Sequence, residues 1–313
     1  MDANTGPRVE FTCRPASLLA PLCPVYIPAS TVVLREFLHT LFVRCPPAAR
    51  RLGLAHEQAA IAARHRRVPE AWAPHLAASQ GAILEGARRC PAKKRALVIG
   101  AGDCLDVPVE ALAAQFEQLI LADVAIGRVA RRWARRFRGR VHAVQWDATG
   151  ALAGLAEKRA TLDRAAAVRL LADADPGSPP GGEPDLVVST NCLSQLGLVP
   201  GHSLPAAEKD AALPARMAAA AAKRHWKWLG ARPGVRVLLT DTAKLDVAPD
   251  GHVLKREPLS HDFGLPKPDR IWRWELAPIP EWDPDYHRVH EVGVWTRGPG
   301  DMGNTVPTDT VKR

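Results

Sequence analysis

The sequence predicts an α/β fold, in which a doubly wound, mostly parallel sheet of seven strands ends in an antiparallel hairpin and follows an N-terminal helical cap. Two observations predict this fold. Short apolar runs alternate five times with stretches of helical spacing, which is typical of parallel strands joined by crossover helices. Two further strand-like runs, at residues 270–276 and 288–296, follow without a helix between them, which indicates an antiparallel pair.

The composition is ordinary for a globular protein, with an excess of positive charge. The 313 residues are enough for one large domain, or for one domain with a cap. The formal net charge of +9 permits an acidic partner, but only a clustered basic patch would argue for one. The six cysteines are scattered without a C-x-x-C pair. We therefore expect no disulfide framework and no metal site, but reduced thiols in a cytoplasmic protein.

The sequence shows neither a secretory signal nor a membrane-spanning segment. The first ten residues contain two acids and no apolar core, so they are not expected to act as a signal. Residues 18–33 are apolar, but Pro21, Pro24 and Pro28 interrupt them too often for a spanning helix. We therefore expect no membrane partner, and the sequence leaves the oligomeric state open.

The first 94 residues form a compositional block without a glycine-rich turn. The spacing of their apolar residues predicts helices over residues 31–43, 56–67 and 73–90. We interpret residues 1–94 as the helical cap and residues 95–297 as the α/β domain. The polar residues 298–313 are expected to form a flexible tail.

The α/β domain begins with an apolar run at residues 95–100, as expected of a strand that is buried on both faces. The dipeptide Asp250-Gly251, after the fifth strand, is a hairpin signal. The other predicted parallel strands cover residues 118–123, 140–146, 185–190 and 235–240. The predicted helices between strands cover residues 107–116, 126–137, 150–172 and 216–229.

The turn after the first strand combines glycines with acids. Gly100 and Gly102 let the backbone pass close to a ligand, because no Cβ intrudes. A dinucleotide-binding loop would need a third glycine where Leu105 stands. It would also place phosphates beside Asp103 and Asp106, and these like charges would repel. The turn therefore favours a cationic nucleotide-like ligand, bound outside the carboxyl ends of the strands as is usual for such sheets.

A family resemblance follows from GAGD at residues 100–103, Asp123, Asp147, and the runs DLVVSTNCLSQL and ARPGVRVLLTD. Over roughly residues 95–296 the chain resembles class I S-adenosylmethionine-dependent methyltransferases. The resemblance implies a seven-stranded sheet with an antiparallel last strand, and S-adenosyl-L-methionine as the cofactor.

The resemblance also implies roles for single residues. Asp123 would accept hydrogen bonds from both ribose hydroxyls, and Asp147 would accept one from the adenine amino group. Such enzymes usually carry an acid two residues before the first glycine, where this chain has Val98, so Asp103 is expected to hold the ammonium group. The predicted cofactor-binding residues are Gly100, Ala101, Gly102, Asp103, Asp123, Val124, Asp147, Ala148, Asn191 and Cys192.

Several of these residues also have a purely structural interpretation. Asp123 and Asp147 could each be the N-cap of the helix that follows, and Cys192 is more often a small buried hydrophobe than a reactive group. The catalytic residue is unknown from the sequence. His202 and His261 lie in predicted loops and are weak candidates for a general base.

Two further features allow a structural or a functional interpretation. Trp272 and Trp274 share one face of a predicted strand, so they pack in the core or form the wall of an aromatic substrate pocket. Seven arginines lie close together on and after the second helix, and a solvated helix face is the default interpretation, with an RNA or other acidic partner as the alternative. They are Arg128, Arg131, Arg132, Arg135, Arg136, Arg138 and Arg140.

We therefore expect a methyltransferase that moves the sulfonium methyl group to a small-molecule acceptor. Three alternatives stay open. An NAD(P)-dependent enzyme is opposed by Asp103 and the missing third glycine. An aminopropyltransferase, which ALVIGAGD also resembles, would carry an acidic motif that STNCLSQL lacks. An RNA methyltransferase, or a non-catalytic nucleic-acid-binding protein of this fold, is supported only by the basic run.

Overall fold

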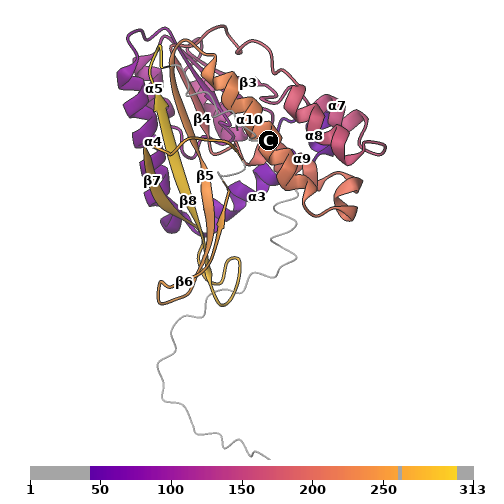
Figure 1. Cartoon of the computed structure of the whole chain (residues 1–313). Coiled ribbons are helices and arrows are strands. Elements are labelled where there is room, and N and C mark those ends of the chain that lie inside the picture. The colour runs from indigo at the N-terminus through magenta and orange to yellow at the C-terminus, as the bar shows by residue number, and fades with distance from the viewer. Residues whose placement is uncertain (1–42, 260–262, 302–313) are drawn as a thin grey trace, which may run out of the picture.

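The centre of the computed structural model, which describes residues 43–259 and 263–301, is an eight-stranded sheet (Figure 1). The strands are β1 (Arg95–Ile99), β2 (Gln118–Asp123), β3 (Val141–Gln145), β4 (Leu186–Thr190), β5 (Val235–Val247), β6 (Val253–Pro258), β7 (Arg270–Ala277) and β8 (His287–Arg297). Their order is β3-β2-β1-β4-β5-β8-β7, and β6 pairs with β5 beside this path. The first five strands are parallel, whereas β8 runs antiparallel to both β5 and β7.

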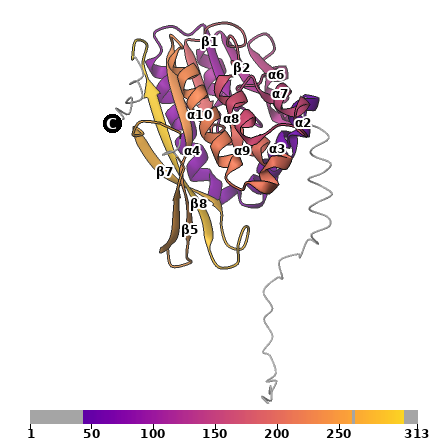
Figure 2. The ribbon, with the colours of Figure 1, turned by 45° about the vertical axis from the view of Figure 1, so that its right-hand side comes forward.

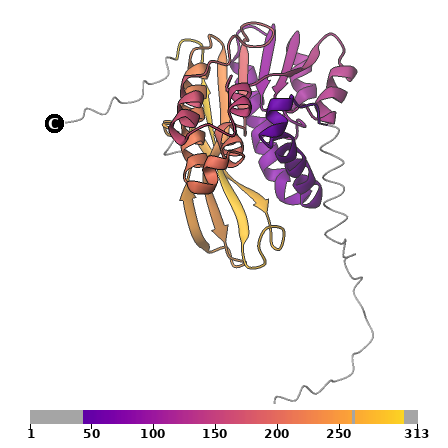
Figure 3. The same cartoon turned by 90° about the vertical axis from the view of Figure 1, so that its right-hand side faces the viewer.

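This topology confirms the predicted parallel sheet and its antiparallel terminal hairpin, and it adds one strand to the seven expected. The addition arises because β5 does not stop at residue 240 but continues to Val247. It then turns at Asp250 and Gly251, whose φ is +90°, as the hairpin signal predicts. The strand that follows, β6, is mostly exposed and charged, so it lacks the apolar pattern that would have predicted it. These strands extend beyond the helices (Figure 3).

The central strands of the sheet are buried on both faces, and alternate residues of each strand point to opposite sides. In β1, Ala96 and Val98 belong to one hydrophobic core, and Leu97 and Ile99 belong to the other. Consequently the strand has no polar side, and its apolar run marks it in the sequence.

Helices cover each face of the sheet. On one face α4, α5 and α6 share a hydrophobic core with β1, β2 and β4, and on the other α10 lies across the sheet with α8 and α9 beside it (Figures 1 and 2). The helices are α2 (Pro47–Arg51), α3 (Leu54–Arg67), α4 (Pro69–Arg89), α5 (Val109–Gln115), α6 (Arg128–Arg136), α7 (Leu152–Glu157), α8 (Arg164–Asp173), α9 (Gln195–His202) and α10 (Leu213–Gly230), with a 3₁₀ turn at Pro205–Lys209. Among the described residues, no helix is both long and apolar enough to cross a membrane.

The single helix predicted over residues 150–172 is wrong. Two helices, α7 and α8, occupy this stretch, and the break between them has a local cause. Asp163 has an extended backbone, and its side chain accepts a hydrogen bond from the Ala166 N–H at 2.8 Å, which is the geometry of an N-cap. A second helix therefore begins at Arg164.

The predicted N-terminal helices can be compared only in part. Those over residues 56–67 and 73–90 correspond to α3 and α4, whereas most of the one over 31–43 lies outside the described residues. Helix α4 packs directly on the sheet, where a Cβ at Gly86 would come within 2.4 Å of Val237. The division at residue 94 and the tail after residue 297 stay predictions.

Candidate functional site

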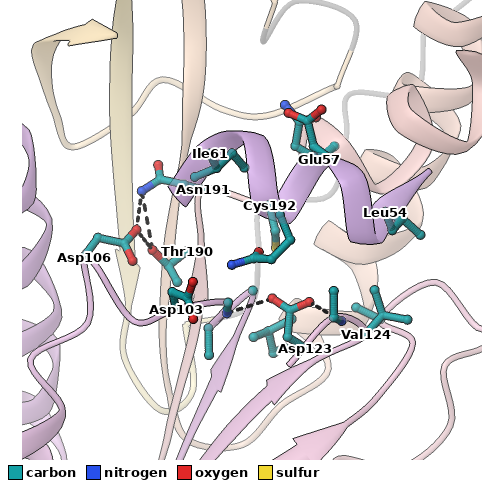
Figure 4. Close-up of a pocket in the computed structure, with 18 of the residues that line it drawn as sticks. Leu54, Glu57, Ile61, Asp103, Asp106, Asp123, Val124, Thr190, Asn191 and Cys192 are labelled. Atoms are coloured by element: carbon teal, nitrogen blue, oxygen red, sulfur yellow. Dashed lines mark hydrogen bonds between the residues drawn. The ribbon is translucent and has the colours of Figure 1, made fainter. Parts of the chain in front are cut away.

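A pocket lies at the carboxyl ends of β1, β2 and β4, with α3 across it (Figure 4). Its walls come from the loops that follow these strands and β3, together with α3, α4, α9 and β7. All ten residues predicted to bind the cofactor line it: Gly100, Ala101, Gly102, Asp103, Asp123, Val124, Asp147, Ala148, Asn191 and Cys192. Their roles in binding stay predictions, but the structure brings them to one place.

The loop after β1 needs its glycines. Gly100 and Gly102 have φ values of +78° and +46°, in the region that disfavours residues with a Cβ. A Cβ on Gly100 would lie 2.7 Å from the Cβ of Cys192 and from the carbonyl oxygen of Thr190. A Cβ on Gly102 would lie 2.9 Å from the side-chain oxygen of Gln58 on α3. The loop therefore passes tightly between the end of β4 and α3.

Asp123, at the end of β2, ties this loop to the next one. Its Oδ2 accepts a hydrogen bond from the Gly102 N–H at 2.9 Å, and its Oδ1 accepts one from the Ala125 N–H at 2.9 Å (Figure 4). The helix that follows, α6, begins only at Arg128, so Asp123 is not its N-cap. Burial raises the pKa of Asp123 to about 6, although these backbone N–H groups act to lower it.

Asp147, after β3, has a different set of contacts. Its Oδ1 accepts from the N–H and the hydroxyl of Thr149, and its Oδ2 accepts from the N–H of Leu152, the first residue of α7. Asp147 therefore stabilises the turn that leads into α7, but the N-cap of that helix is Ala151, so Asp147 is not its N-cap. Asp147 also lines the pocket, where its role in binding stays a prediction.

The two acids of the loop after β1 point to different partners. The Oδ1 of Asp103 accepts from the Val129 N–H at 3.3 Å in the first turn of α6, and a Cβ on Gly127 would collide with the same carboxylate. Asp106, which was not among the predicted site residues, accepts from the Thr190 hydroxyl and the Asn191 side-chain amide, both at 2.6 Å (Figure 4). Asp106 thus links the loop to the end of β4.

The charge of the pocket is negative. Among the described residues, five carboxylate side chains line it and no lysine or arginine does: the acids are Glu57, Asp103, Asp106, Asp123 and Asp147. The chain as a whole has a formal net charge of +9. A cationic ligand therefore suits this pocket, and a ligand with several phosphates does not.

Aromatic side chains form the wall between α4 and β7. His75 of α4 stacks on Trp274 of β7, with ring centroids 4.1 Å apart and an interplanar angle of 9°. Trp72 meets Trp274 edge-on at 4.8 Å, and its indole N–H donates to the Leu276 carbonyl at 2.9 Å. Trp274 lines the pocket, so the alternation of Trp272 and Trp274 marks a pocket wall as well as a packed face.

A buried pair lies next to the aromatic wall. His290 Nδ1 is 3.2 Å from Asp241 Oδ1, and Trp274 meets the His290 ring edge-on at 5.9 Å. Burial acts to raise the pKa of Asp241, but His290 and His75 outweigh it, so the pKa is lowered. This pair holds the edge of Trp274 in place.

The sequence missed the residues that reach the pocket from distant elements. Glu57, Gln58 and His75 belong to the predicted cap, and nothing in their local pattern marks them as part of a site. Conversely, His202 is exposed at the end of α9 and does not line the pocket, while His261 lies outside the described residues.

The cysteines in the described parts of the chain are neither paired nor grouped with other possible metal ligands. There Cys45, Cys90, Cys104 and Cys192 are free thiols, and no group of three or more histidine, cysteine or acidic side chains could hold a metal ion. Burial raises the pKa of Cys192 to about 12, so its thiol is protonated at neutral pH.

Solved structures similar to this chain are methyltransferases. Burkholderia thailandensis 1,6-didemethyltoxoflavin-N1-methyltransferase is 16% identical, with 77% of this chain and 90% of that chain covered and a TM-score of 0.33. A SAM-dependent methyltransferase of Leishmania major is 13% identical over 84% and 82%, with a TM-score of 0.35. A glycopeptide N-methyltransferase is 13% identical over 72% and 78%, with a TM-score of 0.29. No family model and no curated protein matches the chain.

The chain has a class I methyltransferase-like fold. We assign the fold from the parallel sheet with its antiparallel β8, which the sequence resemblance implies, because the TM-scores above are all below 0.5. A likeness of this kind concerns the fold, and function must be argued from the pocket.

Proposed function

We propose that this protein transfers the methyl group of S-adenosyl-L-methionine to a small-molecule acceptor. The observation that carries the proposal is the pocket at the strand ends, whose described lining has five carboxylates and no lysine or arginine. S-adenosylmethionine carries a sulfonium and an ammonium group and no phosphate, so it matches this charge. The proposal includes a cytoplasmic location, which the scattered cysteines favour.

In this proposal the loops after the strands hold the cofactor. Asp123 would accept from the ribose hydroxyls with lone pairs left over from its two backbone hydrogen bonds. Asp147 and Ala148 would border the adenine, and Asn191 and Cys192 the methionine end. Asp103 would hold the ammonium group, as expected, with the lone pairs left over from its hydrogen bond with the Val129 N–H.

The cofactor supplies an activated methyl group, and the protein contributes alignment and the exclusion of water. The acceptor would attack in line: its bond to the methyl carbon would form as the carbon–sulfur bond breaks, and the electron pair of that bond would stay on sulfur. Holding the two reactants in line removes much of the entropy cost of the reaction. Helix α3 across the pocket is well placed to limit access of water.

The charge of the same pocket argues against an NAD(P) cofactor, but it does not separate S-adenosylmethionine from its decarboxylated form. An NAD(P) pyrophosphate would need hydrogen-bond donors and positive charge where Asp103 and Asp106 stand. An aminopropyltransferase would bind decarboxylated S-adenosylmethionine, and the acids would suit that cation too, so binding must separate these candidates.

Calorimetric titration of the full chain tests the proposal. S-adenosylhomocysteine, NADH and decarboxylated S-adenosylmethionine are compared under one set of conditions. We expect S-adenosylhomocysteine to bind and NADH not to bind. A hundredfold excess of ligand over its dissociation constant should then stabilise the fold by about 2.7 kcal/mol. NADH binding without S-adenosylhomocysteine binding would refute the proposal, and a clear preference for the decarboxylated compound would favour the aminopropyltransferase.

An RNA acceptor is the second candidate, because six arginines on and after α6 are exposed: Arg128, Arg132, Arg135, Arg136, Arg138 and Arg140. The aromatic residues of this run, Trp133 and Phe137, pack against the core, so they are not free to stack on bases. We therefore expect only weak binding of tRNA and rRNA fragments that disappears near physiological salt. Tight, selective binding there that is lost on charge reversal of Arg132 and Arg135 would favour the RNA acceptor.

A further inference from the structure

His75 has a fixed protonation pattern. The indole N–H of Trp272 donates to His75 Nδ1 at 3.1 Å, and an indole nitrogen can only donate. Nδ1 is therefore the accepting nitrogen, and the proton of the neutral ring is on Nε2. Burial lowers the pKa of His75 to about 4, so the ring is neutral at pH 7. Since Nε2 already carries a proton, His75 cannot act as a general base in this state.

The Nε2–H group of His75 faces a second set of polar atoms. It lies 3.5 Å from the Asn191 side-chain nitrogen, which is itself a donor to Asp106 Oδ2 at 2.6 Å. Two donors do not bond to each other, so the Nε2–H group of His75 is available to an acceptor in a bound ligand. The Asn191 Oδ1 atom is buried and has no hydrogen-bond partner among the described residues. One end of the pocket thus presents a fixed donor beside acceptors.

The walls around these groups are flat and apolar. Trp274 stacks on His75, and Trp72 stands edge-on to Trp274, and all three side chains line the pocket. The Trp274 indole nitrogen is also buried without a partner among the described residues. Buried polar atoms without partners are uncommon in proteins and often mark a place where a ligand binds. Flat walls with a few fixed polar groups suit a planar ring.

We propose that His75 and Asp106 select the methyl acceptor, and that the acceptor is an uncharged planar ring with a carbonyl-type oxygen beside an O–H or ring N–H. His75 Nε2–H donates to the oxygen, and the Asp106 carboxylate accepts from the O–H or N–H. In the transfer, the acceptor atom bonds to the methyl carbon, and sulfur keeps the electron pair of the broken bond. The proton of the acceptor passes to Asp106 and then to water. This inference rests on the proposed function.

The first test measures the tautomer of His75 in the full-length protein by nitrogen-15 nuclear magnetic resonance. We expect the signals of an Nε2–H ring that does not titrate between pH 5 and pH 8. In Trp272→Phe, which lacks the indole donor, we expect a mixture of tautomers. An Nδ1–H ring in the wild type, or titration near pH 6.5, would overturn the assignment of His75 as a fixed donor.

The second test measures the chemistry of the acceptor by calorimetry on the protein saturated with S-adenosylhomocysteine. The probes are 2-pyridone, which carries adjacent donor and acceptor atoms, benzylamine, which is cationic, and toluene, which is neither. We expect 2-pyridone to bind at least tenfold more tightly than either other probe. Equal or tighter binding of benzylamine would overturn the proposal in favour of an amine acceptor.

Variants of His75 separate a contact with the acceptor from a structural role. We expect His75→Leu to weaken 2-pyridone binding at least tenfold, and His75→Gln, whose amide N–H can donate, to stay within threefold of the wild type. The matched control is His252→Leu, an exposed histidine in the β5–β6 turn, which should change nothing. If His75→Leu does not fold, Trp272→Phe and His75→Gln still test whether His75 contacts the acceptor.

Binding of S-adenosylhomocysteine distinguishes the two proposals. It should be unchanged in every His75 variant that folds. Its absence in the wild type would refute the proposed function. If S-adenosylhomocysteine binds but the protein does not prefer 2-pyridone to the other probes, only the inference about the acceptor fails.

Discussion

One end of the pocket, here called the strand end, is formed by the loops after β1, β2 and β3. Backbone N–H groups nearby hold most of its carboxylates. Asp123 and Asp147 show this pattern. At the aromatic end, formed by Trp72, His75, Asn191 and Trp274, other side chains hold these residues in place. The difference indicates two tasks. Backbone loops suit a constant ligand such as a cofactor, whereas interlocking side chains can vary with the acceptor.

Replacement of Asp123 by alanine should have the largest effect and tests whether the strand end binds the cofactor. Loss of two charge-assisted hydrogen bonds should weaken S-adenosylhomocysteine binding by about 2–3 kcal/mol, roughly 30- to 150-fold. Asp123→Asn, which keeps one acceptor oxygen, should lose less binding affinity than Asp123→Ala. Calorimetry on both variants and on His75→Gln checks the comparison between the two ends. An equal loss of S-adenosylhomocysteine affinity in the Asp123 and His75 variants would show that the two ends do not differ in cofactor binding.

A second prediction concerns the close packing of the loop after β1. Gly100 and Gly139 both have a positive φ, +78° and +82°, but only Gly100 is crowded, since nothing lies within 4 Å of a Cβ on Gly139. The shared backbone cost cancels between Gly100→Ala and Gly139→Ala. We expect Gly100→Ala to be less stable by about a further 1–3 kcal/mol, the usual cost of overpacking. Urea denaturation measures the difference, and equal stabilities would show that the loop can move aside.

The parts of the structure that could be predicted from the sequence are those that neighbouring residues in the chain determine. The strand end follows from residues that stand directly after apolar runs, and its ten predicted residues do line one pocket. The aromatic end depends on contacts such as His75 with Trp272, which are 197 residues apart, and no local pattern specifies that pairing. The break between α7 and α8 was missed although Asp163 is a local signal, because the apolar spacing on both sides of it suits one continuous helix.

The pH dependence of cofactor binding gives a smaller and sharper test of the strand end. Burial raises the pKa of Asp123 to about 6, and only the ionised carboxylate can accept from both ribose hydroxyls. Binding must therefore release a proton below pH 6, and S-adenosylhomocysteine affinity should fall by up to about tenfold per pH unit there and stay flat above it. Asp123→Asn should remove the slope, and a slope that persists would assign it to another group.

The stability of the fold depends on pH in the opposite direction to cofactor binding. Because the folded pKa of Asp123 lies above its unfolded value, the folded state holds more protons between about pH 4 and pH 6. This carboxyl therefore contributes stability at low pH that is lost as the pH rises through 6. Urea denaturation of the ligand-free protein and of Asp123→Asn separates this contribution from those of other groups.

The smallest effect is expected at the contact between α3 and the β7–β8 loop. Glu281, in the loop between β7 and β8, accepts from Arg67 of α3 at 2.6 Å and lies 3.6 Å from Arg64. Since these arginines are partly exposed, Glu281→Gln should cost no more than about 1 kcal/mol of stability. Glu110→Gln, which breaks the more exposed pair with Arg136, is the matched control and should cost less. A larger loss of stability for Glu110→Gln would show that the contact between α3 and the β7–β8 loop contributes little.

The contrast between an acidic pocket and a basic chain has a consequence for rates of encounter. A cationic ligand approaching from solution meets the field of a chain with a formal net charge of +9 before it meets the five carboxylates inside. Fields are screened over about 8 Å at physiological ionic strength, so added salt weakens the distant repulsion more than the close attraction. The association rate constant of S-adenosylmethionine should therefore rise with salt, whereas that of a polyanion such as RNA should fall.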